Sequence, residues 1–244
     1  MMNFRFCMQS YCFREFKTID QLVDLIKKTG ILGVELSPSH ISPETSVEEI
    51  REIREKFEKE KIRIESCGIY NFTSNVEENK KIFRFASTLG VKVISADIEP
   101  DAIKLVENQC IDFNIKLAIH NHGKDHRYGT VKQLKELFSR TGSSVGLCLD
   151  TAWALDAGED PVKCIGIFKE RMLGIHLKDF KFSEDGKPVD VIAGDGGLKL
   201  EQLFQAVEKI NFWGFISFEY EGNPANPLPE ITRSVKKVKD VLGQ

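Results

Sequence analysis

Eight short apolar segments alternate with longer amphipathic segments along the 244-residue chain. The apolar segments, which we expect to be strands, are residues 3–11, 33–37, 62–70, 91–97, 115–122, 144–150, 171–179 and 214–221. Each is apolar enough to be buried on both faces, and strands alternating with helices are typical of a parallel α/β sheet. An open doubly wound sheet would need a glycine-rich first turn, but residues 9–16 contain no glycine. The sequence therefore predicts a (β/α)8 TIM barrel of the α/β class, a single domain over residues 1–244.

Capping residues mark where the intervening helices begin and end. Three pairs fit the capping box, in which the two side chains satisfy free backbone amides: Ser46 with Glu49, Ser74 with Glu77, and Thr130 with Gln133. Gly30, Gly90 and Gly142 stand where helices should end, because glycine tolerates a left-handed backbone conformation.

Charge and cysteine usage exclude several classes of protein. The chain has 34 basic and 37 acidic side chains, and no basic run follows a phosphate backbone, so we expect no nucleic-acid partner. The six cysteines form no Cys-x-x-Cys pair, which fits a reducing compartment. No segment approaches the roughly 18 apolar residues of a membrane span, and no signal peptide is visible. We expect a cytoplasmic protein with no membrane partner, and the sequence leaves open whether it forms a homo-oligomer.

Polar side chains gather at the ends of the predicted strands. In a TIM barrel, the C-terminal ends of the strands and the loops that follow them build the active site. The candidates there are Glu35, Tyr70, Asn71, Asp97, Glu99, His120, Asn121, His122, Asp150, His176, Lys178, Asp179, Glu219, Tyr220 and Glu221.

Histidines and carboxylates are concentrated on the last four strands. The set comprises four of the five histidines and two strand-end acids: His120, His122, His126, His176, Asp150 and Glu219. A mixed set of imidazole and carboxylate groups at one rim suits a divalent ion such as Mn²⁺, Mg²⁺, Co²⁺ or Zn²⁺. Carboxylates buried together without a cation would be strongly destabilised by desolvation and repulsion. The sequence therefore predicts a divalent metal site.

Each of these residues also has a structural interpretation. A single strand-end histidine is more often a hydrogen-bonded structural residue, and Asp150 alone could cap the next helix. Only the combination on four adjacent strands favours a metal site. Trp153 could offer a stacking face to a sugar ring, and His126 with Arg127 could reach a substrate anion. The amides of residues 194–197 could hold a phosphate, although a plain turn is the favoured interpretation.

Four motifs in the second half of the chain resemble a known family. The segments LCLDTAW, GIHLKDF, VIAGDGGLKLEQLFQAV and GFISFEYEGNP are similar to the sugar phosphate isomerase/epimerase superfamily with the xylose isomerase-like barrel. In that family Glu, Asp, His and Glu hold a divalent ion, and the last three correspond to Asp150, His176 and Glu219. The first position is His120, in an IHNHG motif that indicates an atypical branch, and Trp153 also departs from many relatives.

The resemblance implies a metal-dependent isomerase or epimerase of a sugar or sugar phosphate. The metal ligands would be His120, Asp150, His176 and Glu219, and a proton would be removed next to a carbonyl to give an enediolate. Glu219 would also be the base, His122 an acid or hydrogen-bond donor, and Lys178 the third catalytic residue. The carbohydrate substrate would contact Glu35, Tyr70, Asn71, Trp153, Asp179 and Glu221.

Two other functions stay open at this point. A dehydratase or lyase acting on a keto-inositol or a 3-keto-sugar would use the same metal site and the same intermediate. A non-catalytic sugar-binding barrel would keep the pocket without turnover. A repair endonuclease is disfavoured, because it needs further histidines on the earlier strands and a basic surface, and the net charge here is −3.

Overall fold

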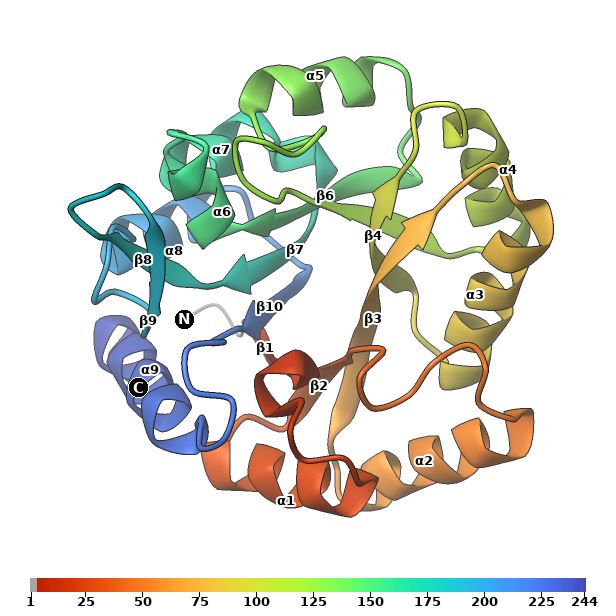
Figure 1. Cartoon of the computed structure of the whole chain (residues 1–244), viewed down its shortest axis with the longest axis horizontal. Coiled ribbons are helices and arrows are strands. Elements are labelled where there is room, and N and C mark those ends of the chain that lie inside the picture. The colour runs from red at the N-terminus through yellow and green to blue at the C-terminus, as the bar shows by residue number, and fades with distance from the viewer. Residues whose placement is uncertain (1–3) are drawn as a thin grey trace.

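A closed ring of eight parallel strands forms the centre of the computed structural model, which describes residues 4–244 (Figure 1). The barrel strands are β1 (Arg5–Gln9), β2 (Gly33–Leu36), β3 (Arg63–Phe72), β4 (Val93–Ile98), β5 (Lys116–His120), β6 (Val145–Asp150), β7 (Met172–Leu177) and β10 (Phe215–Phe218). They follow this order around the ring, and β10 pairs with β1 to close it. Each overlaps a predicted strand, so the prediction of a single-domain TIM barrel is confirmed.

Helices surround the barrel on its outer side (Figure 1). They are α1 (Ile19–Thr29), α2 (Val47–Lys59), α3 (Val76–Leu89), α4 (Ile103–Phe113), α5 (Val131–Ser139), α6 (Thr151–Asp156), α7 (Pro161–Ile167), α8 (Leu200–Lys209) and α9 (Leu228–Leu242). Short 3-10 helices lie at Ser10–Phe13 and Lys169–Arg171. None of the described helices is long and apolar enough to cross a membrane.

The capping residues agree with the sequence at most helix ends. Ser46 caps α2, and Thr130 with Gln133 forms a complete capping box at α5. Gly30 and Gly90 end α1 and α3 in the left-handed conformation. Two predictions are wrong. The side chain that caps α3 is Asn75 rather than Ser74, and α5 ends three residues before Gly142 because Arg140 is its C-cap.

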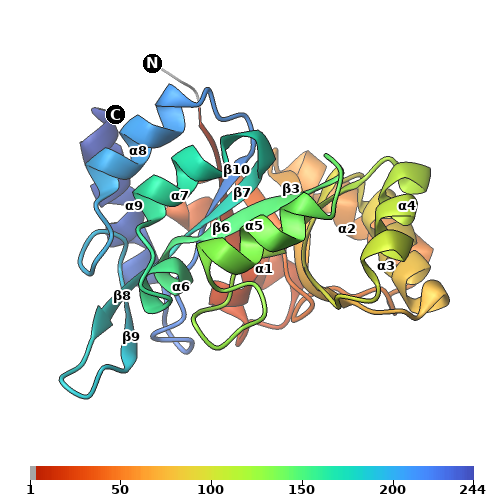
Figure 2. The same ribbon diagram turned by 90° about the horizontal axis from the view of Figure 1, so that it is seen from above.

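A two-stranded antiparallel hairpin interrupts the regular pattern between β7 and α8. It consists of β8 (Asp179–Phe182) and β9 (Pro188–Val191). Figure 2 shows it projecting from the end of the barrel opposite the C-terminus of the chain. The sequence did not predict the hairpin, since residues 171–179 read as one strand whereas β7 ends at Leu177.

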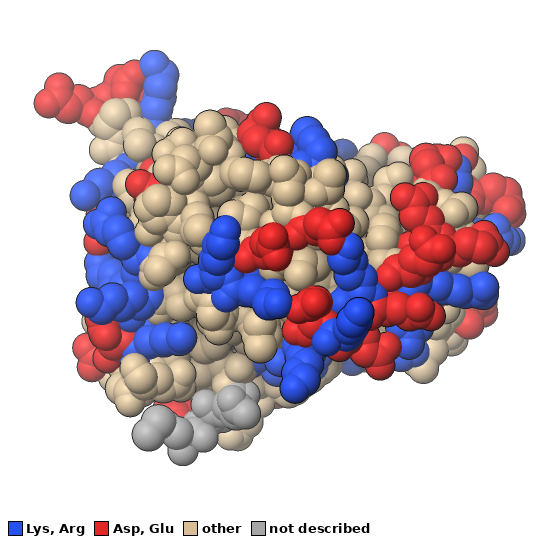
Figure 3. Space-filling view, turned by 90° about the horizontal axis from the view of Figure 1, so that it is seen from below, with Lys and Arg blue, Asp and Glu red and all other residues tan. Residues whose placement is uncertain are grey.

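Apolar side chains fill both the helix–strand layer and the inside of the barrel. A small cluster within the ring consists of Cys7, Val93, Ala118, Cys148, Leu173 and Phe215. All six cysteines are buried and free. On the face shown in Figure 3, acidic and basic side chains are interspersed, as expected for a formal net charge of −3.

Candidate metal centre

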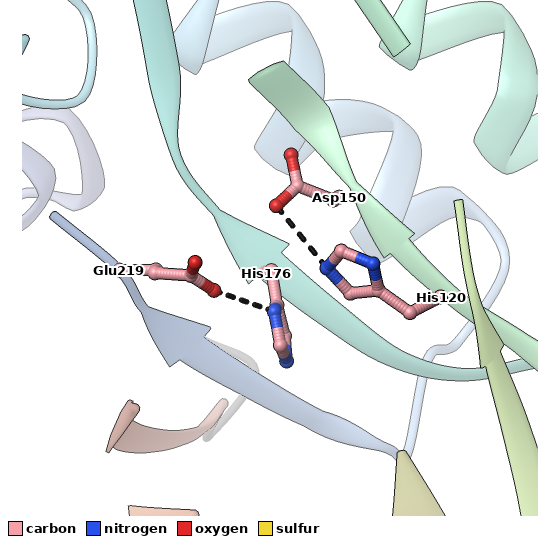
Figure 4. A group of neighbouring side chains, drawn as sticks. All are labelled: His120, Asp150, His176 and Glu219. Carbon is pink, nitrogen blue, oxygen red and sulfur yellow. Dashed lines mark ion pairs between the residues drawn. The ribbon is translucent and has the colours of Figure 1, made fainter. Parts of the chain in front are cut away.

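Four polar side chains from neighbouring strands meet at the C-terminal end of the barrel. They are His120 of β5, Asp150 of β6, His176 of β7 and Glu219, which follows β10. One nitrogen or oxygen atom of each lies within 4.8 Å of those of the other three. Figure 4 shows His120 and Asp150 turned toward each other, and Glu219 turned toward His176. The structure thus brings together the four residues that the sequence predicts as ligands.

Each of the four side chains has one buried atom without a hydrogen-bond partner. These atoms are His120 Nε2, Asp150 Oδ2, His176 Nδ1 and Glu219 Oε2. They form two close pairs, 3.4 Å between the His120 and Asp150 atoms and 2.6 Å between the His176 and Glu219 atoms. Buried polar atoms in native proteins nearly always have a partner. Two imidazoles and two carboxylates are a donor set that binds divalent ions, so these residues fit a metal ion.

The opposite sides of three of these residues are held by the protein. Asp150 Oδ1 accepts a hydrogen bond from the Trp153 amide at 2.8 Å, so the predicted helix cap is also present. Glu219 Oε1 accepts one from Lys178 Nζ at 2.9 Å. Such partners fix the orientation of metal-binding side chains.

Glu35 lies behind His176 rather than in a substrate pocket. Its side chain is fully buried, one oxygen is 2.8 Å from His176 Nε2, and the other accepts a hydrogen bond from Ser95. In the tautomer that donates its Nε2 proton to Glu35, His176 presents the lone pair of Nδ1 on the side of Glu219. The prediction that Glu35 contacts substrate is therefore corrected: Glu35 contacts His176 and Ser95 and does not line the pocket described below.

Lys178 is a buried cation at the centre of three carboxylates. Its side chain is 1% exposed, and its amine donates to Glu219 and Glu221 and lies 3.8 Å from Asp190 Oδ2. Burial alone would raise the pKa of Glu219, but the charges of Lys178 and His176 outweigh it and hold that pKa well below its usual value. Burial, opposed by Lys178, raises the pKa of Asp190 to about 7. The sequence missed Asp190 because it lies on the unpredicted hairpin.

A pocket of 460 Å³ opens beside the four ligands. Its lining residues are Gln9, Tyr11, Ser37, Pro38, Ser39, Gly68, Ile69, His120, His122, Trp153, Glu219 and Glu221. Of these, the last five were predicted site residues, and the others come from β1, β3 and the segments after β1 and β2. A larger cleft of 870 Å³ lies at the opposite end of the barrel, but none of the four ligands lines it. The smaller pocket is therefore the candidate active site.

Besides Glu35, three predicted substrate contacts do not line this pocket. Tyr70 packs against Phe85 of α3, with ring centroids 6.0 Å apart, because alternate residues of β3 face the helix layer. Asn71 is exposed, beside Asp97 in the sheet register. Asp179 is fully buried.

Asp179 explains the glycine-rich segment after the hairpin. Its carboxylate accepts hydrogen bonds from the amides of Gly194, Gly196 and Leu198 at 2.9, 2.8 and 3.0 Å. These amides, which could have held a phosphate, thus hold an internal carboxylate. Asp179 fixes the base of the hairpin instead of binding substrate.

The loop after β5 brings His122 onto Trp153. The two rings are stacked with centroids 4.5 Å apart, so His122 covers the Trp153 face that was predicted to bind a sugar. Desolvation, together with the nearby His120, lowers the pKa of His122 to about 4. His126 and Arg127 both pair with Asp97, at 3.2 and 3.5 Å, so they are not free for a substrate anion.

Proteins with similar sequences include several inosose dehydratases. One from Clostridium botulinum is 22% identical over 273 residues, which covers 91% of this chain and 89% of the relative. One from Clostridium beijerinckii is 27% identical over 149 residues, but the match covers 54% of this chain and only 50% of that relative's length.

Solved structures with the same fold span more than one reaction. The probable 3-DHS dehydratase AsbF of Bacillus anthracis has a TM-score of 0.79 at 14% identity, covering 98% of this chain and 99% of that one. The 3-keto-D-glucoside 4-epimerase YcjR of E. coli has a TM-score of 0.76 at 13% identity, covering 98% and 100%. The IolI protein, solved with a bound zinc atom, has a TM-score of 0.77 at 18% identity, covering 98% of each.

A family profile also matches most of the chain. The profile of the xylose isomerase-like TIM barrel family matches residues 23–240, which include all four ligands and all barrel strands except β1. The chain belongs to the xylose isomerase-like TIM barrel family.

Proposed function

We propose that the protein is a metal-dependent lyase that removes water from a keto sugar or keto-cyclitol. The observation that carries the proposal is the group of four unpartnered buried atoms on His120, Asp150, His176 and Glu219. A divalent ion held there would supply positive charge beside the substrate carbonyl and stabilise the negative charge that develops on its oxygen. The similarity to inosose dehydratases supports a lyase over the isomerase or epimerase that the sequence motifs imply.

Glu221 is the group best placed to accept the substrate proton. Glu219 has one oxygen turned to the ligand cluster and the other bonded to Lys178, so neither is free. Glu221 lines the pocket and contacts Lys178 through its Oε1 atom. Burial and the charge of Glu219 raise the pKa of Glu221, which makes it a stronger base. We therefore assign proton abstraction to Glu221 in place of Glu219, with Lys178 holding both carboxylates.

Elimination requires proton transfer on only one side of the substrate. Glu221 takes the proton from the carbon next to the carbonyl and passes it to the hydroxyl oxygen on the following carbon. The C–O bond then breaks, water leaves, and a carbon–carbon double bond remains. Epimerisation returns the proton to the opposite face and needs a second group there. The described lining residues from the β1, β2 and β3 side hold no carboxylate, histidine or lysine: Gln9, Tyr11, Ser37, Pro38, Ser39, Gly68 and Ile69.

Isomerisation or epimerisation is the second candidate function. One observation favours it, because His122 also lines the pocket and reaches it from the β5 side. Its imidazole could return a proton to a face that Glu221 does not reach.

The test is to load the protein with divalent metal and supply a panel of keto-inositols, 3-keto-sugars and ketoses in deuterated water. We expect mass spectrometry to show loss of one water from a keto-inositol or 3-keto-sugar. Glu221→Gln should slow this by about 10²–10⁴-fold, whereas Glu184→Gln on the exposed hairpin turn should not. Formation of an epimer of unchanged mass would support the second candidate, and no turnover of any compound would support a sugar-binding barrel.

A further inference from the structure

We infer that the pocket selects an uncharged ring-shaped polyol and rejects phosphorylated or carboxylated forms of the same ring. The inference rests on the proposed function, since both place the substrate in this pocket, and it adds the charge class of that substrate. Its starting observation is that no lysine or arginine is among the described residues that line the pocket, whereas Glu219 and Glu221 are.

The cations nearest the pocket are already engaged within the protein. The Lys178 side chain is 1% exposed and its amine contacts Glu219 and Glu221. At the rim, the Arg14 guanidinium donates to the carbonyl oxygens of Tyr11 and Glu221 at 3.2 and 3.0 Å. To reach a substrate anion, either residue would have to break these contacts, and Lys178 would leave two carboxylates uncompensated.

The two other features that could hold an anion have partners too. Arg127 forms an ion pair with Asp97, whose carboxylate lies 3.5 Å from the guanidinium group. The carboxylate of Asp179 accepts hydrogen bonds from three backbone amides of the glycine-rich residues 194–198. A phosphate in the pocket would therefore find the guanidinium groups of Arg14 and Arg127 and the amides of residues 194–198 already engaged.

The balance of charge at the site leaves no positive surplus. The carboxylates of Asp150 and Glu219 match the charge of a divalent ion, and Lys178 matches Glu221. Asp190, whose Oδ2 lies 3.8 Å from the Lys178 amine, adds no positive charge. An anionic substrate would thus enter a partly desolvated pocket beside Glu219 and Glu221 without a free cation to compensate it, which is a direct means of rejecting it.

The uncharged part of the lining fits a ring with hydroxyl groups at its edge. Side chains with an apolar face that can contact the C–H faces of such a ring are Tyr11, Pro38 and Ile69, and polar uncharged ones that can bond its hydroxyls are Gln9, Ser37 and Ser39. The volume of 460 Å³ is that of a small-molecule site.

Equilibrium binding to the metal-loaded protein tests the inference without turnover. The probes are myo-inositol and myo-inositol 1-phosphate, compared by calorimetry. We expect the neutral ring to bind at least about tenfold more tightly, a difference of roughly 1.4 kcal/mol. Equal or tighter binding of the phosphate, or binding of neither probe, would overturn the inference. Selective binding by a protein that releases no water from any keto-polyol would leave it standing and defeat the proposed function.

A charge placed at the pocket should change the preference. Ser39→Lys adds a cation to the lining, and we expect it to raise affinity for the phosphate at least about tenfold. Ser143→Lys, the same change at the opposite end of the barrel, should leave both affinities unchanged. If Ser39→Lys does not fold, Glu221→Gln removes a negative charge instead. It should reduce the difference in affinity between the neutral ring and the phosphorylated ring. If the ratio of the affinities for the two probes is unchanged in the folded variant, the inference is wrong.

Discussion

The two ends of the barrel both contain buried polar groups and an open cleft, but they differ in whether those groups have partners. At the N-terminal end, the Arg171 guanidinium donates to four backbone carbonyls, of Phe138, Thr141, Gly142 and Val145. Across the barrel at the same end, the carboxylate of Glu65, whose side chain is 1% exposed, pairs with both Arg5 and Arg63. Polar groups at this end are satisfied by the fold itself.

At the C-terminal end, one buried atom each of His120, Asp150, His176 and Glu219 has no hydrogen-bond partner, and these side chains bring ligand atoms within 4.8 Å of one another. The cleft there is the smaller of the two, 460 Å³ against 870 Å³. The comparison teaches that unsatisfied buried atoms, rather than cavity size, distinguish the end that binds a ligand from the end that stabilises the fold.

Removing a ligand should have the largest effect. His176→Ala deletes Nδ1 from the cluster, so we expect bound metal to fall well below one ion per chain. Turnover of the proposed substrate should fall by about 10³-fold, equivalent to roughly 4 kcal/mol of transition-state stabilisation. Elemental analysis of protein purified without chelator measures the first effect and steady-state kinetics the second. Full metal occupancy in this variant would show that the four atoms are not a metal site.

The corresponding experiment substitutes a residue at the N-terminal end of the barrel. Arg171→Ala leaves four carbonyl groups without their donor, and we expect the free energy of unfolding to fall by about 2–4 kcal/mol. Metal content should stay at the wild-type value, because Arg171 is at the opposite end from the ligands. Urea unfolding and elemental analysis on the same sample check both statements. Loss of metal from a folded Arg171→Ala protein would break the division between the two ends.

The fold and the clustering of the four candidate ligands could be predicted from sequence because both depend on local patterns. Apolar runs of strand length recur eight times, and a ligand at the last residues of a parallel strand must lie at the common rim. His120, Asp150, His176 and Glu219 all meet this condition, and the structure brings them together.

The substrate contacts could not be predicted in the same way. Successive residues of a strand face opposite sides, and nothing local to Tyr70 and Asn71 says which of the two faces the helices. Glu35 was misassigned because its partner, His176, is 141 residues away in the chain. Asp190 depends on the antiparallel register of the hairpin, in which it lies opposite Phe180. Such contacts follow from the three-dimensional packing and not from a motif.

A substitution of Glu35, which lies behind His176, should have a smaller effect than removing a candidate ligand. It also tests the difference between the two ends of the barrel. Glu35→Gln keeps the shape of the side chain but removes the charge that holds the Nε2 proton of His176. We expect metal affinity to fall about 10–100-fold, the usual effect of losing a carboxylate behind a histidine ligand. Competition with a chelator of known affinity measures it. Glu65→Gln, a buried glutamate paired at the other end, is the matched control and should leave metal affinity unchanged while lowering stability.

The smallest expected effect concerns the stability of the chain against pH. The pKa of Asp190 is raised from 3.8 to about 7, chiefly by burial, and its Oδ1 atom is buried without a partner. The folded protein therefore keeps this proton between these pH values while the unfolded chain releases it, so stability falls as the pH rises from 4 to 7. Asp190→Asn should be more stable than the wild type at pH values above 7, by about 1–2 kcal/mol, with the gain vanishing toward pH 4. Denaturant unfolding across this range measures the difference, and Asp112→Asn, on the exposed face of α4, should show no such trend. A gain that grows as the pH falls would mean that Asp190 is stabilised as an anion by Lys178, and that this carboxylate resembles the paired ones of the N-terminal end.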